Sequence, residues 1–173
     1  NMRCGNHRFS ELFNELFKPN ERLQKKIDYH QGYLTDKYIS ISFRFTTLLG
    51  DFTDCTGAPL PEDERIKLIQ QSLDVVEKIK VSAPAHNMVL VTADSERFLA
   101  EVSKLAGVYV IPGKVGHIDY DHGDDVNMKT FLDFFLISGA QKVYLAKGKG
   151  MYNSAFAKTA ALVNNREFEM YEY

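Results

Sequence analysis

Hydrophobic and polar residues alternate between Lys37 and Phe45, where the chain reads KYISISFRF. A period of two with β-branched and aromatic residues predicts a strand over 38–45. Arg44 stands where this strand should end, and a short apolar run and Gly50 follow. The placement of a permanently charged guanidinium at the end of a buried strand needs a physical reason.

The first thirty residues follow a helical rhythm instead. Apolar side chains recur every three or four positions, and Pro19 interrupts the pattern, since proline removes a helix hydrogen bond. A second short helix follows, with Leu23 and Ile27 on one face and His30 one turn further on. We therefore expect two N-terminal helices within residues 8–30. The apolar positions of the first are Phe9, Leu12, Phe13, Leu16 and Phe17.

Helical and extended patterns alternate over the rest of the chain. Helices are expected over 59–80, 95–107, 127–140 and 154–165, and strands over 87–94, 108–112, 142–146 and 166–173. In the first of these helices the buried face is expected to hold Ile66, Ile69, Leu73, Val76 and Ile79. This alternation predicts an α/β, Rossmann-like, three-layer domain with a mainly parallel sheet. We place that domain at 36–173 and a helical segment at 1–35.

Composition fits a globular protein of 173 residues, with 45% hydrophobic and 25% charged positions. A net charge of −2 gives no sign of bulk binding to nucleic acid. No apolar run is long enough to span a bilayer, and the N-terminus has no apolar signal-peptide core. Cys4 and Cys55 show no metal-type spacing. We expect reduced thiols and a cytoplasmic location.

Ligands of open parallel sheets bind beyond the carboxyl ends of the strands. Three polar features fall there: Arg44, the segment TADS at 92–95, and the loop KGKGMYNS at 147–154. A glycine-containing loop that enters a helix offers free backbone N–H groups and the positive end of the helix dipole to an anion. Ser154 can bond a phosphate oxygen there, or only cap the helix. Lys147, Lys149 and Asn153 are further candidates in the same loop.

Two other residues at this edge have alternative interpretations. Arginine is the preferred bidentate partner of phosphate, which favours Arg44 as a ligand residue. Arg44 could instead be a surface arginine paired with Asp51 or Asp54. Asp94 could contribute to the site, or simply cap the helix that follows it.

Asp133 lies in the apolar helical segment KTFLDFFLIS. An isolated buried carboxylate is unfavourable, so a buried Asp133 needs a partner. That partner is either a protein donor or a ligand with paired N–H groups, such as guanine. An exposed position is the remaining alternative.

The loop GHIDYDHGDD is rich in histidine and aspartate but matches no calcium or zinc motif. A solvated loop is the favoured interpretation, and no metal site is predicted. Its first histidine, His117, is a possible site residue because it could lean over the edge of the sheet. The acidic and histidine positions are His117, Asp119, Asp121, His122, Asp124 and Asp125.

Three short motifs, taken in their order along the chain, resemble those of the GDP-fucose-dependent fucosyltransferases. That group comprises the α1,6-fucosyltransferases, the rhizobial nodulation fucosyltransferases and, more distantly, the protein O-fucosyltransferases. The motifs are a strand ending in SFR (42–44), a strand ending in TAD (92–94), and LDFFLIS (132–138) followed by a strand and the MYNS loop (151–154). The resemblance covers most of 36–170 and implies one half of a GT-B glycosyltransferase.

The resemblance also implies roles for single residues. Arg44 would bind the diphosphate of GDP-fucose and stabilise the leaving group, as the catalytic residue. Asp133 would recognise guanine, and Ser154 would bind phosphate with backbone N–H groups of its loop. Tyr152 stands at the family's aromatic position, and Asp94 would support the site or contact the nucleotide. The implied reaction inverts the anomeric centre, uses a nucleotide sugar and a glycan or other hydroxyl acceptor, and needs no metal cofactor.

Two positions depart from the family pattern. Ser42 replaces the histidine that helps to hold the base, and Phe45 replaces a second arginine of some members. A GT-B enzyme also needs an acceptor-binding half, for which 1–37 is too short. The sequence therefore leaves two functions open: a glycosyltransferase domain for a GDP-sugar, or a nucleotide-sugar-binding module without catalysis.

Overall fold

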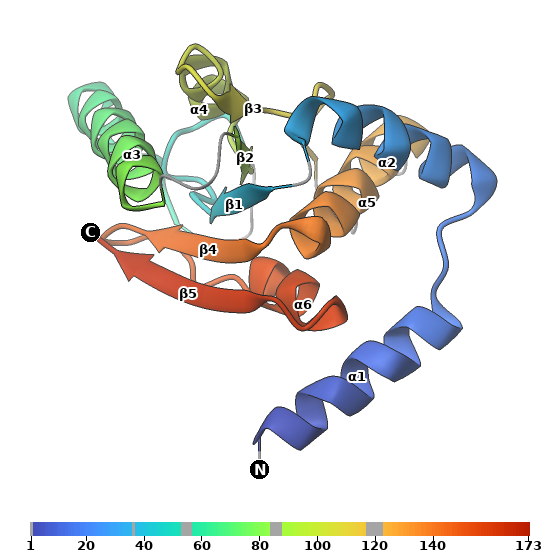
Figure 1. Cartoon of the computed structure of the whole chain (residues 1–173). Helices are drawn as coiled ribbons and strands as arrows, with labels where there is room; N and C mark the ends of the chain where they lie inside the picture. The colour runs from blue at the N-terminus through green and yellow to red at the C-terminus, as the bar shows by residue number, and fades with distance from the viewer. Residues whose placement is uncertain (1, 36, 53–56, 84–87, 117–122) are drawn as a thin grey trace.

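The protein is a three-layer α/β domain built on a five-stranded, fully parallel sheet (Figure 1). The computed structural model describes residues 2–35, 37–52, 57–83, 88–116 and 123–173, with side chains from residue 8 onward. The strand order is β3-β2-β1-β4-β5, which is the Rossmann order 3-2-1-4-5-6 without its last strand. The strands are β1 (Tyr38–Phe43), β2 (Met88–Ala93), β3 (Val108–Tyr109), β4 (Lys142–Lys147) and β5 (Glu167–Glu172).

The three central strands end at the same edge of the sheet. Ser42 of β1 is in register with Thr92 of β2 on one side and with Leu145 of β4 on the other. From β1 the chain proceeds to β2 and β3 on one side, and it then crosses back to β4 and β5 on the other side of β1. A crevice is therefore expected between the loops that leave β1, β2 and β4.

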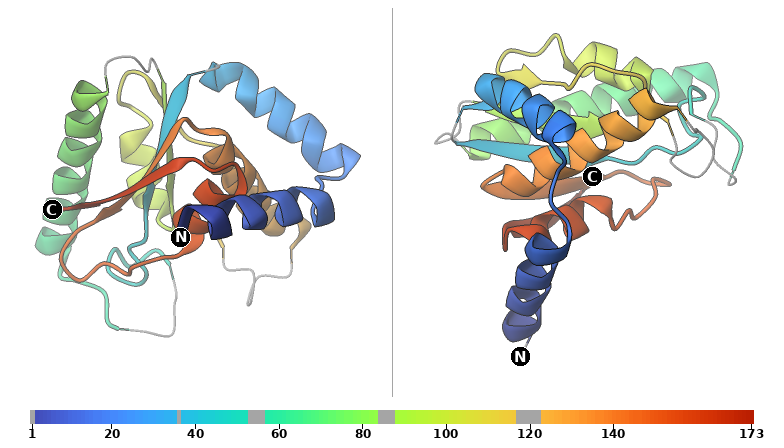
Figure 2. Two further views of the ribbon diagram at one scale, coloured as in Figure 1. Left: turned by 60° about the horizontal axis from the view of Figure 1, so that its bottom comes forward. Right: turned by 90° about the vertical axis from the view of Figure 1, so that its right-hand side faces the viewer.

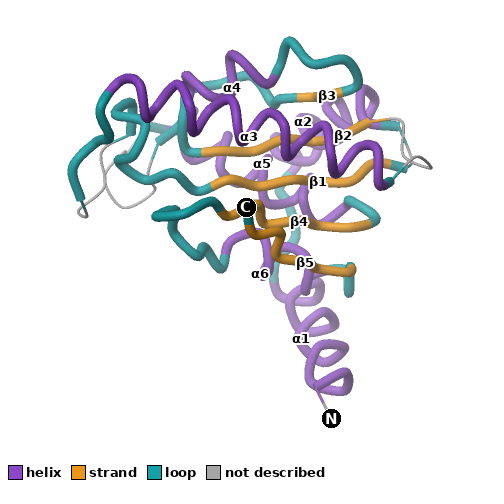
Figure 3. Tube along the Cα trace, turned by 90° about the vertical axis from the view of Figure 1, so that its left-hand side faces the viewer, coloured by secondary structure: helices purple, strands orange, loops and turns teal. Residues whose placement is uncertain are grey.

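Helices cover both faces of the sheet (Figure 3). The first apolar core lies between the sheet and α3 (Glu62–Ser82) with α4 (Glu96–Val102). The second lies between the opposite face and α2 (Glu21–Leu34), α5 (Asp124–Gly139) and α6 (Phe156–Val163). Because side chains alternate along a strand, β1 sends Ile39 and Ile41 into the first core and Tyr38 into the second. Ser42 lies on the α5 side by the same alternation.

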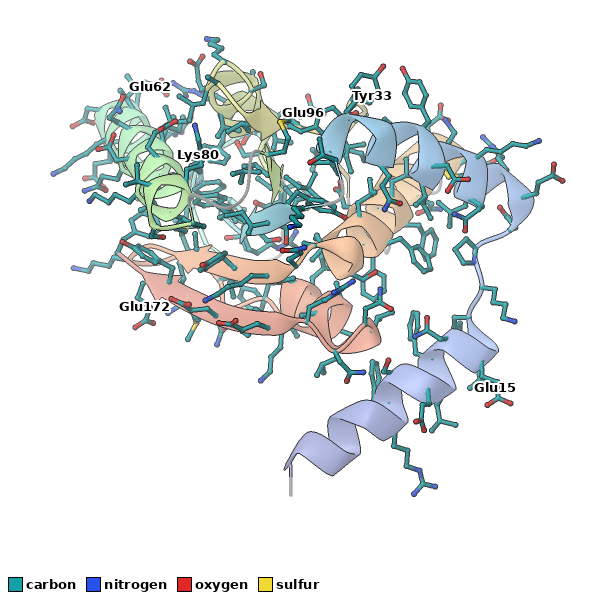
Figure 4. All side chains as sticks on the ribbon, in the orientation of Figure 1. Glu15, Tyr33, Glu62, Lys80, Glu96 and Glu172 are labelled. Carbon is teal, nitrogen blue, oxygen red and sulfur yellow. The ribbon has the colours of Figure 1, made fainter. Side chains whose placement is uncertain are left out.

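Helix α1 (Met2–Leu16) extends away from the rest of the domain (Figures 1 and 2). It is attached to α6, where the hydroxyl of Ser10 donates to the carbonyl oxygen of Val163 at 2.6 Å. The Phe13 ring lies 5.8 Å from that of Phe134 on α5. Glu15 of α1 and Glu62 of α3 lie at opposite ends of the molecule (Figure 4).

The predicted α/β fold and its element order are confirmed, with several boundaries corrected. The N-terminal helices separate at Pro19 as expected, and the Asn20 side chain caps α2 by accepting from the N–H of Leu23. The strand expected over 38–45 ends at Phe43, and β3 is shorter than 108–112. Helix α6 begins at Phe156 rather than at residue 154. No described helix is long and apolar enough to cross a membrane.

One predicted core position is wrong. Ile66 of α3 is 55% exposed, whereas Leu68 and Ser72 are buried. The buried face of α3 is therefore rotated slightly about the helix axis relative to the face that the apolar positions predicted. Cys55 and His117, with three neighbours of His117 in the acidic loop, lie outside the described residues, and so do the side chain of Cys4 and the alternative partner Asp54. The division into 1–35 and 36–173 stays a prediction.

Candidate nucleotide site

A cavity of about 290 Å³ lies where the loops after β1, β2 and β4 meet α5 and the start of α6. Its polar wall is formed by residues that are up to 112 positions apart in the sequence (42 to 154). Six of the predicted site residues line it: Ser42, Arg44, Asp94, Asp133, Tyr152 and Ser154. The sheet edge predicted to carry chemistry therefore does collect these side chains.

Arg44 leaves β1 and is held by the carboxylate at the end of β2. Its Nε lies 3.3 Å from Oδ2 of Asp94, and its guanidinium carbon lies 4.8 Å from the centre of the Phe52 ring. The Arg44 side chain is 23% exposed and also lines the cavity. An aromatic face and a carboxylate limit the orientations of the guanidinium, so the charge is fixed at the cavity wall.

Asp94 is buried and organises the loop that carries Arg44. Its two carboxylate oxygens accept from the backbone N–H of Phe45 at 2.8 Å and of Thr46 at 2.7 Å. Burial raises the pKa of the Asp94 carboxyl, and Arg44 and these N–H groups oppose the rise. The alternative role of helix cap falls instead to Ser95, which accepts from the N–H of Phe98 at 3.1 Å. Asp94 thus acts across the sheet, between two loops.

The two residues that depart from the fucosyltransferase pattern, Ser42 and Phe45, both make contacts inside the protein. The Ser42 and Thr92 hydroxyls are 2.8 Å apart and both line the cavity. Phe45 is fully buried, and the centre of its ring lies 5.0 Å from the centre of the Phe98 ring. The position of the second family arginine is therefore part of the apolar core in this protein.

Asp133 has a protein partner that the sequence interpretation did not identify. The Lys129 ammonium donates to both carboxylate oxygens of Asp133 at 2.7 Å, one helical turn away. Their side chains are 5% and 15% exposed, and both line the cavity. Burial raises the pKa of Asp133, while the charge of Lys129 opposes that rise. The i, i+4 spacing of opposite charges in an apolar helix was the available signal.

The loop after β4 brings its last residues to the cavity. The N–H of Tyr152 donates to the carbonyl oxygen of Arg44 at 3.1 Å, which joins this loop to the one after β1. The N–H of Met151 and that of Ser154 are hydrogen-bonded within the loop. Donors for an anion are therefore expected from the first turn of α6 and from the Ser154 hydroxyl rather than from these bonded loop amides. The Ser154 Oγ accepts from the N–H of Phe156 at 3.3 Å.

The remaining candidates do not join this group. Lys147, Lys149 and Asn153 lie outside the described residues that line the cavity, and Lys147 lies 3.4 Å from Glu172 on β5. His117 falls outside the part of the chain that the structure describes. Within that part, no cluster of three metal-ligating side chains is found.

Comparison with known proteins identifies the fold. No protein-family model matches the chain, and no curated protein sequence matches it. Among solved structures, the fold is similar to that of fucosyltransferase NodZ from Bradyrhizobium, with a TM-score of 0.59 and 17% identity. NodZ alpha-1,6-fucosyltransferase co-crystallized with GDP gives a TM-score of 0.57 and 18% identity. Each match covers 88% of this chain and 45% of the NodZ chain.

The expected resemblance to fucosyltransferases is confirmed at the level of the fold. The NodZ crystal soaked with GDP-fucose gives a similar match, with a TM-score of 0.55 and 17% identity. The chain spans slightly less than half the length of these neighbours, since it covers 45% of the NodZ chain. The α/β architecture of this chain is thus shared with part of the fucosyltransferase NodZ.

Proposed function

We propose that this chain is the donor-binding domain of a glycosyltransferase for GDP-fucose or a related GDP-sugar. The observation that carries the proposal is the convergence of Arg44, Asp133 and Ser154 on one cavity at the carboxyl edge of the sheet. The resemblance of the sequence motifs to the fucosyltransferases implies the same three residues as ligands of a nucleotide sugar. The cavity of about 290 Å³ is close to the lower end of ordinary ligand pockets, about 300 Å³.

The proposed arrangement follows from charge. The diphosphate would lie between the Arg44 guanidinium and the first turn of α6, because both are positive. The base would lie against Asp133 on α5. In an inverting transfer, an acceptor hydroxyl attacks the anomeric carbon and gives its proton to a base or to water, while the bond to the diphosphate breaks and GDP leaves. Arg44 would stabilise the charge that develops on the departing diphosphate, because it is already oriented by Asp94.

A nucleotide-sugar-binding module without transfer activity is the second candidate. Ser42 favours it, because Ser42 is hydrogen-bonded to Thr92 at the position where the fucosyltransferase pattern has a histidine. A glycan or other hydroxyl acceptor would need a second binding half. Transfer by the whole protein is therefore a proposal separate from donor binding.

Thermal shift with GDP, GDP-fucose, UDP and NAD tests the donor class. We expect GDP and GDP-fucose to raise the melting temperature and UDP and NAD to have little effect, because only ligands that bind the folded state stabilise it. No shift with any guanine nucleotide would refute the proposal. A shift that survives unchanged in both Arg44→Ala and Asp133→Asn would place the site elsewhere. Binding of GDP-fucose without transfer of fucose to any acceptor would favour either the binding module or a donor-binding domain that needs a separate acceptor-binding half.

A further inference from the structure

Lys129 and Asp133 form an ion pair in the wall of the cavity. Both lie on the same face of α5, and the Lys129 Nζ is 2.7 Å from each carboxylate oxygen. A lysine ammonium has three N–H donors, so the two bonds to Asp133 leave it able to donate again. The carboxylate likewise has lone pairs beyond those that face Lys129. The pair thus offers a donor and an acceptor side by side to a ligand.

The position of Lys129 is fixed by the loop after β3. Gly113 has a φ of +136°, which favours glycine, and a Cβ there would lie 3.3 Å from Cδ and 3.7 Å from Cβ of Lys129. The loop therefore packs closely against the aliphatic part of the lysine. This packing leaves the side chain only 5% exposed.

A paired donor and acceptor match one nucleobase edge better than the others. Guanine presents two adjacent N–H donors, at N1 and at the 2-amino group, next to the carbonyl oxygen at C6. A carboxylate can accept both N–H groups while a neighbouring ammonium donates to the carbonyl. Uracil offers one N–H between two carbonyls, so one carboxylate oxygen would face a carbonyl oxygen. Adenine has no carbonyl and no second donor group on this edge.

We propose that Lys129 is a specificity-determining residue for the base, donating from Nζ to the C6 carbonyl while Asp133 accepts from N1–H and the 2-amino group. This assignment rests on the proposed function, since it presupposes a nucleotide in the cavity. Lys129 would distinguish bases that carry a carbonyl oxygen at C6 from bases that lack it, which Asp133 alone cannot do. A ligand without the carbonyl leaves a buried ammonium donor unmatched, and unmatched buried polar groups are what give a site strong selectivity.

Isothermal titration of the full chain with two ligands tests the assignment. The ligands are GDP and 6-thioguanosine 5′-diphosphate, which keeps N1–H and the 2-amino group but replaces the C6 oxygen by sulfur, a weak acceptor. For the wild-type chain we expect GDP to bind roughly 5- to 30-fold more tightly, which corresponds to losing most of one hydrogen bond to a charged group. In Lys129→Met the ratio should fall to about three or less. Lys25→Met, which changes an exposed lysine of α2, should keep the wild-type ratio.

The outcomes separate this inference from the proposed function. Failure of GDP to bind the wild-type chain refutes the proposed function and the inference together. Tight GDP binding with equal affinity for the analogue overturns the role of Lys129 and leaves the proposed function standing. Lys129→Met could fail to fold, since it leaves Asp133 buried without its partner. In that case Lys129→Arg, which keeps the charge but moves the donors, should fold and show a reduced ratio, and an unchanged ratio would count against the inference.

Discussion

Arg44 and Asp94 follow different strands but form one unit, because the Asp94 carboxylate lies 3.3 Å from Nε of Arg44 and accepts from the next two backbone N–H groups along the chain. Thr46, the second of those donors, has a φ of 54°, in the left-handed region. Non-glycine residues occupy that region only when their surroundings hold them there. Asp94 therefore sets the conformation of the loop and the direction of Arg44 together.

Replacement of Asp94 by alanine should destabilise the fold strongly. Two buried N–H groups would lose their acceptor and Arg44 its ion pair, so we expect a loss of about 2–4 kcal/mol in the free energy of unfolding. Urea denaturation followed by circular dichroism measures it. Asp74→Ala, at an exposed position of α3 that bonds Gln70, should change stability by less than about 0.5 kcal/mol. Equal effects of the two substitutions would contradict the role given to Asp94.

Arg44 is expected to contribute to nucleotide affinity through its planar guanidinium, which can donate two parallel hydrogen bonds to a phosphate. Arg44→Lys keeps the charge but loses bidentate geometry, so GDP should bind about 10-fold more weakly. Arg44→Ala should weaken binding further, to about 100-fold. Arg97→Ala is the matched control, because Arg97 forms its ion pair with Glu62 of α3. Titration calorimetry gives the three dissociation constants, and identical values for Arg44→Ala and Arg97→Ala would remove Arg44 from the site.

A substitution at Ser154 distinguishes a role in ligand binding from a role in capping α6. Its hydroxyl accepts one long hydrogen bond of 3.3 Å at a half-buried position, so Ser154→Ala should change the free energy of unfolding by less than about 0.5 kcal/mol. Loss of a hydrogen bond to phosphate should weaken GDP binding about 5- to 10-fold. Denaturation and calorimetry on the same variant distinguish the two. A drop in stability above about 1 kcal/mol with unchanged affinity would identify Ser154 as a cap only.

His30 predicts how stability depends on pH. Its ring is buried against Tyr109, with 2.7 Å between Nδ1 and the hydroxyl. Burial, together with the charges of Lys26 and Lys129, lowers the pKa of His30 below its ordinary 6.5. The unfolded chain therefore binds a proton at His30 more readily than the folded one. Stability contributed by neutral His30 should be complete above pH 6.5 and fall as the pH is lowered through 6.5 towards the folded pKa.

The His30 prediction is checked by urea denaturation at several pH values with His30→Gln as the reference. The other histidines titrate in both proteins, so the difference between the two isolates His30. We expect that difference to shrink below pH 6.5. A difference that is independent of pH would show that the His30 pKa is the same in the folded and unfolded states.

The helices and strands could be predicted from the sequence because they depend on local patterns. The alternation in 37–45, the helical spacing around Pro19 and the glycine-containing loop into α6 each depend on residues that are neighbours in the chain, so the elements and their order could be predicted. The strand order could not, because it depends on which strands pair across long connections. The exposed position of Ile66 was missed because helical periodicity alone does not set the rotation of a helix against its sheet.

The candidate site divides in the same way. Arg44 and Ser154 were predictable because each follows a strand whose carboxyl end must lie at the ligand edge. The partner of Arg44 was not, since Asp94 is 50 residues away and the nearer acids, Asp51 and Asp54, were the obvious alternatives. The pairing of Lys129 with Asp133 was within reach of sequence reasoning, because the two are one helical turn apart.

A crystal structure of the chain with GDP would decide whether the cavity is a guanine-nucleotide site. We predict nucleotide density in the cavity, with the diphosphate between Arg44 and Ser154 and the guanine edge against Asp133. Nucleotide bound at another surface, or bound in the cavity with the base beside Arg44 and the diphosphate beside Asp133, would refute the proposed site. An empty cavity at saturating GDP would refute it equally.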